Sequence, residues 1–100
     1  MEKRTPHRKL TVVKDLVKAG KVRATATAIN GASELGINSV DEMCGVVLSL
    51  TTKSFYKSMT THGDHRIWQD VYRFEDPRGF DIYLKLTVID DVLIVSFKEL

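Results

Sequence analysis

The sequence predicts an α+β domain in which about three helices come first and a four-stranded antiparallel sheet follows. Apolar residues at helical spacing, together with helix caps, are confined to the first 50 residues. Four β-rich runs separated by polar turns then occupy residues 55–97. This order is typical of α+β proteins. The length of 100 residues suits a single domain, residues 1–100, with the helices on one face of the sheet.

The first predicted helix begins at Thr5-Pro6 and ends at Gly20. Threonine is a preferred cap, proline is favoured at the first helical position, and glycine commonly follows a helix. Between these ends lies one apolar stripe, formed by Leu10, Val13, Leu16 and Val17. The next residues, Val22-Arg23, are expected to form a short extended link.

The second segment, Ala24 to Leu35, is ambiguous. Its alternation of Ala and Thr suits a strand. Helical spacing before Gly36 is shown instead by Ala28, Ile29, Ala32 and Leu35. We favour a helix, although Asn30-Gly31 is unusual inside one. A third helix is predicted from the capping box Ser39-Val40-Asp41-Glu42 to about Leu50.

The predicted strands are residues 55–60, 67–74, 80–89 and 92–97. The turns between them are His62-Gly63-Asp64, Asp76-Pro77-Arg78-Gly79 and Asp90-Asp91. Aspartate tolerates the positive φ that two-residue hairpin turns require. The last two strands are therefore expected to pair across Asp90-Asp91.

That turn predicts which residues of the last hairpin face each other. One face pairs apolar residues only, which indicates the core: Leu84 with Phe97, Leu86 with Val95, and Val88 with Leu93. The other face pairs Thr87 with Ile94, Lys85 with Ser96, and Tyr83 with Lys98. Tyr83 and Lys98 should thus be neighbours, with Lys85 on the same face.

The first two strands leave one question open. Residues 55–60 place Phe55, Lys57 and Met59 on one side, and residues 67–73 place Gln69 and Arg73 on one side. Gln69 joins the face of Tyr83 if the loop around Pro77 has odd length. Such a face, left uncovered by the helices, can bind phosphates and stack on a base. The same pattern also suits an ordinary solvated sheet face.

Composition excludes several classes of protein. The apolar fraction of 43% and charged fraction of 28% are those of a soluble globular protein, and no apolar run is long enough to span a membrane. The lone Cys44 excludes an internal disulfide, so a reducing, cytoplasmic setting is expected. His62 and His65 lie in a polar turn, which favours a solvated loop over a metal site. No metal and no cofactor are expected.

Four stretches of the sequence closely resemble a known family. They are MEKRTPH at the start, FYKSMTT at 55–61, DHRIWQDVYR at 64–73 and VLIVSFKE at 92–99. Together they resemble the motility quorum-sensing regulator toxins, which are ribonucleases of bacterial toxin–antitoxin pairs. The resemblance implies a RelE-like fold and an mRNA endoribonuclease that acts without the ribosome or a metal at GC-containing sites, chiefly GCU. It also implies a zinc-containing antitoxin, through which alone the toxin reaches operator DNA.

The resemblance carries activity to four residues: Lys57, Gln69, Tyr83 and Lys98. Arg73 and Lys85 are added here as RNA-binding residues, because they share the strands of these four. Two departures from the family pattern stand out. Asp90 occupies a turn position where the best-known relative has a histidine, and the segment 74–80 differs.

Two other function classes remain open from the residues alone. A non-catalytic RNA- or DNA-binding module is favoured by the basic N-terminal region, which holds eight of the 15 Lys and Arg in residues 1–23. A pure protein-interaction domain is favoured by the apolar residues of the sheet.

Overall fold

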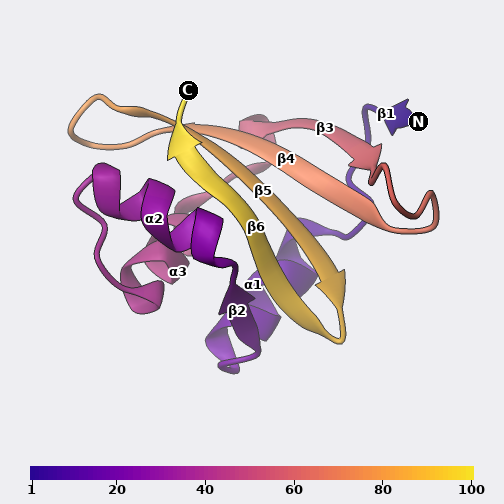
Figure 1. Cartoon of the computed structure of the whole chain (residues 1–100), viewed down its shortest axis with the longest axis horizontal. Coiled ribbons are helices and arrows are strands. Elements are labelled where there is room, and N and C mark those ends of the chain that lie inside the picture. Colours follow the sequence, from indigo (N-terminus) through magenta and orange to yellow (C-terminus); the bar gives the residue numbers. More distant parts are fainter.

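The computed structural model describes residues 1–100, which form three helices and a six-stranded sheet (Figure 1). The elements in chain order are β1 (Glu2–Lys3), α1 (Leu10–Lys18), β2 (Val22–Ala24), α2 (Ala26–Glu34), α3 (Val40–Ser49), a 3₁₀ turn (Thr52–Ser54), β3 (Phe55–Thr60), β4 (Trp68–Glu75), β5 (Asp81–Ile89) and β6 (Asp91–Glu99). The α+β class and the order of helices before the meander are confirmed.

The sheet has the strand order β1-β3-β4-β5-β6-β2, so the predicted count of four strands was wrong. The four predicted strands form its antiparallel centre. At one edge β1 pairs antiparallel with β3, and at the other β2 pairs parallel with β6. The edges of a bare meander would carry unpaired backbone groups. Glu2–Lys3, for which no structure was predicted, and Val22–Ala24, predicted in part as an extended link, cover those edges instead.

The three helices gather on one side of the sheet (Figure 1) and enclose the core with it. Sixteen buried residues form this core, and the largest come from both layers: Tyr72, Phe97, Met43, Leu50, Ile82, Leu84, Leu86 and Ile94. The opposite side of the central strands is free of helices, as predicted.

The start of the first helix was predicted wrongly, because α1 begins at Leu10 rather than at Pro6. The carboxylate of Asp70, buried on β4, accepts hydrogen bonds from the backbone N–H groups of His7 (2.9 Å) and Arg8 (3.1 Å). A buried carboxylate must be satisfied by donors. Residues 4–9 therefore form an arm that is held against β4 by Asp70, and the helix starts after it.

The second helix is confirmed, although it begins at Ala26 and Ala24 belongs to β2. Thr25 caps it by accepting a hydrogen bond from the N–H of Ala28 (3.1 Å). Close packing explains why a glycine occupies position 31 inside this helix. A Cβ there would lie 1.9 Å from the carbonyl oxygen of Phe97. The glycine thus lets α2 lie directly against β6.

The third helix is confirmed with its predicted cap. The hydroxyl of Ser39 accepts a hydrogen bond from the N–H of Glu42 (3.1 Å), and α3 runs from Val40 to Ser49.

The predicted register of the last hairpin is confirmed in its outer half. Tyr83 faces Lys98, Leu84 faces Phe97, and Lys85 faces Ser96.

Nearer the turn the predicted register was wrong. Leu86 faces Ile94 rather than Val95, and the pairs continue with Thr87–Leu93 and Val88–Val92. Asp90 alone makes the bend, with φ of 65°, and a register shift beside Lys85 and Leu86 compensates for the shorter turn. The shift keeps the core face apolar, because Ile94 and Val92 are buried in the positions predicted for their neighbours.

A second bulge corrects the prediction for β3. Phe55 faces Tyr72 whereas Lys57 faces Val71, so Tyr56 is an extra residue between them. Phe55 consequently packs on the core side, in edge contact with Tyr72 at 5.6 Å between ring centroids. It does not share a side with Lys57, contrary to the prediction.

Candidate functional site

The uncovered side of β3–β6, termed here the open face, carries two rows of side chains that cross the strands. The first is termed the aromatic row: Tyr56, Arg73, Tyr83 and Lys98. The second is termed the lysine row: Lys57, Val71, Lys85 and Ser96. Along each strand the rows are about 7 Å apart, since they are two residues apart on β4–β6.

In the aromatic row, cations and rings alternate across four strands. Arg73 faces Tyr83, which faces Lys98. The guanidinium carbon of Arg73 lies 3.8 Å from the ring centroid of Tyr56, and the ammonium of Lys98 lies 5.3 Å from that of Tyr83. Both distances are within the range of cation–π attraction. Tyr83 is thus held between two cations.

In the lysine row, the two lysines flank an apolar residue, Val71. Val71 is fully buried yet does not belong to the core cluster, and its register partners are Lys57 and Lys85. The aliphatic parts of lysine side chains commonly cover apolar surface while the ammonium groups stay near water. The ammonium of Lys85 lies 6.0 Å from the ring centroid of Tyr83, which links the two rows.

The two lysines of this row have opposite electrostatic surroundings. Burial, together with the positive charges of Lys98 and Lys57, lowers the pKa of Lys85. The pKa of Lys57 is raised, mainly by its hydrogen bond to Glu2 and further by the nearby Tyr56 and Tyr83. Lys57 is therefore held as an ammonium ion.

The carboxylate of Glu2 comes to the site through β1. Its Oε1 lies 2.7 Å from Nζ of Lys57, and the Lys57 side chain is 20% exposed. Glu2 is placed there because it faces Met59 on β3, while the amino group of Met1 donates to Oγ1 of Thr60 (3.1 Å). Glu2 was not predicted as a site residue, because nothing in the sequence shows that residues 2–3 pair with β3.

Gln69 shares the open face but lies at its other end. Arg73 faces Tyr83, and residues 69, 71 and 73 alternate onto the same side of β4, so the alternative that places Gln69 on this face is confirmed. It is four residues from Arg73, about 13 Å along the strand. Its register partner on β3 is Met59. Gln69 is thus remote from Arg73, Tyr83 and Lys98 of the aromatic row. It lies only two residues along β4 from Val71, which faces both Lys57 and Lys85, so it borders the lysine row.

Two further residues at the candidate site, Tyr56 and Arg4, were not predicted from the sequence. Tyr56 joins the open face only because of the bulge in β3, which the pattern FYK does not reveal. Arg4 arrives from the arm, where its guanidinium donates to the carbonyl oxygen of Tyr56 (3.4 Å). Arg4 was counted among the basic residues of the N-terminal region, but its place in the fold could not be predicted.

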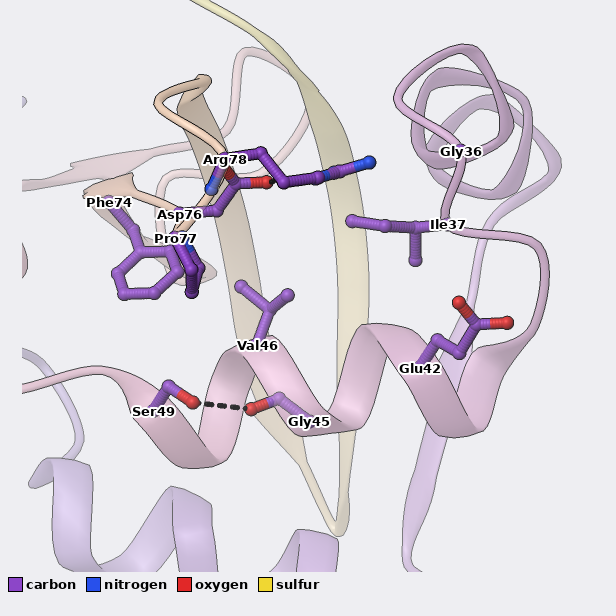
Figure 2. A pocket seen from close by; sticks show the side chains of 10 residues that line it. All are labelled: Gly36, Ile37, Glu42, Gly45, Val46, Ser49, Phe74, Asp76, Pro77 and Arg78. Carbon is purple, nitrogen blue, oxygen red and sulfur yellow. Dashed lines mark hydrogen bonds and ion pairs between the residues drawn. The ribbon is translucent and has the colours of Figure 1, made fainter.

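The site is an open surface. Four cavities are found, and none is lined by any residue of the two rows. The cavity in Figure 2, of about 380 Å³, lies on the helix side between α3 and the loop that joins β4 to β5. There Arg78 and the buried Asp76 form an ion pair at 2.7 Å. That pair shapes the loop and lies outside the candidate site.

Several residues whose side chains could bind a metal, react or stack lie outside the open face. No group of three or more His, Cys, Asp and Glu side chains is arranged to hold a metal ion. His62 and His65 lie in the polar turn predicted for them. Cys44 is half-buried beside the core, and its pKa is raised by burial. The Trp68 ring stacks on His7 of the arm, with ring centroids 5.6 Å apart, and the ammonium of Lys3 on β1 lies 4.1 Å from it. No helix has the length and hydrophobicity that crossing a membrane would require.

Comparison with known proteins adds two findings. The family described as "Motility quorum-sensing regulator, toxin of MqsA" matches residues 5–99. The chain is also 60% identical over 99 residues to the mRNA interferase toxin MqsR of Escherichia coli strain K12, and the match covers 99% of both chains. The four stretches that suggested the resemblance lie within a similarity that runs almost from end to end.

Proposed function

Because the chain belongs to the motility quorum-sensing regulator toxin family, we propose that it is an mRNA interferase that cuts mRNA at short GC-containing sites, chiefly GCU. The endoribonuclease acts in the cytoplasm without the ribosome or a metal ion and thereby stops translation and growth. The observation that carries the proposal is the clustering of three cations and a tyrosine on the open face: Lys57, Lys85, Lys98 and Tyr83.

The chemistry needs proton transfer and stabilisation of negative charge. The 2′-hydroxyl next to the scissile bond loses its proton and attacks the phosphorus, and the 5′-oxygen leaves and gains a proton. The products are a 2′,3′-cyclic phosphate and a 5′-hydroxyl end. A positioned acid or base speeds such a reaction, and cations stabilise the phosphorane.

Each role in this mechanism falls to a residue of the open face. Lys98 and Lys57 stabilise the charge on the phosphate, and the raised pKa of Lys57 supports a cationic role for it. Tyr83, between Arg73 and Lys98, transfers one of the two protons, as acid or as base, and one of the two lysines transfers the other. Lys85 and Arg73 contact neighbouring phosphates. Gln69, at the other end of the face, orients the RNA.

Purified protein incubated with a defined RNA tests the proposal. Discrete cuts at GC sites that leave 5′-hydroxyl ends, unchanged by EDTA, are expected. Intact RNA that only migrates more slowly on a gel would instead indicate a non-catalytic RNA-binding module. The flat face without a cavity favours that second candidate, because stacking platforms bind single strands without chemistry.

The partner of the chain is proposed to be an antitoxin that contains zinc and binds operator DNA. The family description names an antitoxin for the toxins it groups, which supports a partner of this kind. Copurification of the chain with the product of an adjacent reading frame, followed by zinc analysis of the complex, tests the pairing.

A further inference from the structure

We propose that Tyr56, Arg73 and Arg4 form a nucleotide-binding subsite. It lies beside the group of three lysines and a tyrosine proposed to cut RNA, termed here the reactive cluster: Lys57, Lys85, Lys98 and Tyr83. A base of the RNA stacks on the Tyr56 ring, and the adjoining phosphate contacts the two guanidinium groups. This inference rests on the proposed function and extends it, since it assigns a place to a nucleotide that flanks the scissile phosphate.

The bulge in β3 determines the position of Tyr56. In an unbroken strand its side chain would lie on the opposite side from that of Lys57. The bulge between Phe55 and Lys57 makes Tyr56 an extra residue and brings its ring to Arg73 of the open face. Bulges often redirect a side chain next to a functional site. Arg73 covers one face of the ring and the residue remains half-exposed, so a base can stack on the side that Arg73 leaves free.

Two positively charged guanidinium groups lie near the Tyr56 ring. The guanidinium carbon of Arg73 lies 3.8 Å from the centroid and that of Arg4 lies 5.5 Å from it, and both side chains are exposed. Neither arginine forms an ion pair with a carboxylate, in contrast to Lys57, which is paired with Glu2. Two unpaired guanidinium groups beside an aromatic ring match the phosphate and the base of one nucleotide.

The Tyr56 ring lies two strands away from Tyr83 of the reactive cluster. Tyr56 on β3 and Tyr83 on β5 are separated by β4, so they are about 10 Å apart at the usual strand spacing. Arg73 lies between them and contacts the first while facing the second. An RNA strand that crosses the sheet along the aromatic row would therefore meet the reactive cluster and then the subsite.

Cleavage kinetics on RNAs of graded length test the subsite. The minimal oligonucleotide contains one cleavage site, and two series extend it by one to three nucleotides on the 5′ or the 3′ side. For the wild type, KM is expected to fall on the order of tenfold when one side is extended, because stacking on an aromatic ring has this strength. In Tyr56→Leu the ratio of KM between minimal and extended RNA should fall to about one. Tyr56→Phe should restore it.

The matched control is Phe80→Leu. Phe80 is another exposed aromatic residue next to an arginine, with the guanidinium carbon of Arg78 5.0 Å from its ring, but it lies in the loop between β4 and β5. This variant should keep the wild-type ratio. Equal ratios in wild type and Tyr56→Leu would overturn the subsite and leave the proposed function standing.

A binding measurement separates the two proposals. RNA with a 2′-O-methyl group at the cleavage position cannot be cut, and 2-aminopurine at the flanking position loses fluorescence when it stacks. Quenching by the wild type, but not by Tyr56→Leu with an unchanged melting temperature, supports the subsite even if natural RNA is never cut. Equal quenching by both proteins would overturn it.

Discussion

Oε1 of Glu2 lies 2.7 Å from Nζ of Lys57, so the N-terminal strand supplies a counter-ion to a lysine of the reactive cluster. The hydrogen bond raises the pKa of Lys57 and lowers that of Glu2. In Glu2→Gln the pKa of Lys57 is expected to fall, which an NMR titration of its ammonium nitrogen measures. Glu75→Gln removes an exposed carboxylate on β4 that has no ion pair and should leave this titration unchanged. An unaltered Lys57 titration in Glu2→Gln would contradict the pairing.

The same pair predicts a pH window. The lowered pKa of Glu2 means that its contribution to stability is present above the ordinary value of 4.5 and is lost as the pH falls through the lower native value. The raised pKa of Lys57 means that the contribution is fully present below the ordinary value of 10.5 and is lost as the pH rises from there through the higher native value. The difference in melting temperature between wild type and Glu2→Gln should therefore be greatest between these limits and shrink outside them. A difference that does not depend on pH would argue against an ionic contact.

Tyr83→Phe should lower the rate of RNA cleavage by about 100-fold or more, which is the usual contribution of a positioned acid or base. The ring and its packing remain, so RNA affinity and melting temperature should stay close to those of the wild type. Single-turnover cleavage and a binding titration measure the two effects separately. Cleavage at the wild-type rate would rule out proton transfer by Tyr83.

Removal of residues 98–100 should abolish cleavage before it abolishes folding. Lys98 is lost, whereas Phe97, the last core residue of β6, is kept. The folding cost is a few backbone hydrogen bonds at the strand end, such as that from Leu100 to Asp81 (2.8 Å), at about 1 kcal/mol each. Circular dichroism and cleavage assays compare this truncation with one that lacks only Leu100, which should remain active. An active 97-residue protein would exclude an essential Lys98.

Two glycines inside helices should respond to alanine in opposite directions. Gly31→Ala places a Cβ against the carbonyl oxygen of Phe97 and should lower the free energy of unfolding by about 1–3 kcal/mol. Gly45→Ala in α3 meets no atom within 4 Å and should raise it by up to about 1 kcal/mol. Chemical denaturation measures both. Stabilisation by Gly31→Ala would show that α2 does not press on β6.

Local sequence signals predicted most of the central fold. The helix from Ser39, the four central strands and the facing of Tyr83 and Lys98 each depend on neighbouring residues, namely a cap, an alternation and a turn. The facing pair was nevertheless predicted from a turn that is one residue too long. The shift beside Leu86 compensates for that error, because a core face must remain apolar.

What sequence reasoning missed depends on contacts between distant segments. Asp70 prevents Thr5-Pro6 from starting a helix by accepting hydrogen bonds from the arm, and this pairing spans more than 60 residues. Glu2 reaches Lys57 for a similar reason, through a strand of two residues whose sequence has no β pattern. Tyr56 was assigned to the wrong side because a bulge depends on how β3 and β4 pair.

The absence of a cavity at the reactive cluster bears on inhibitor discovery. Drug-sized molecules generally bind where a concave pocket encloses most of their surface. None of the four cavities touches the residues proposed to cut RNA, so competitive inhibitors of this kind have no enclosed volume to occupy. Effective blockers of this face should instead resemble its substrate: uncleavable oligonucleotide analogues that spread over several strands and draw their affinity from many shallow contacts.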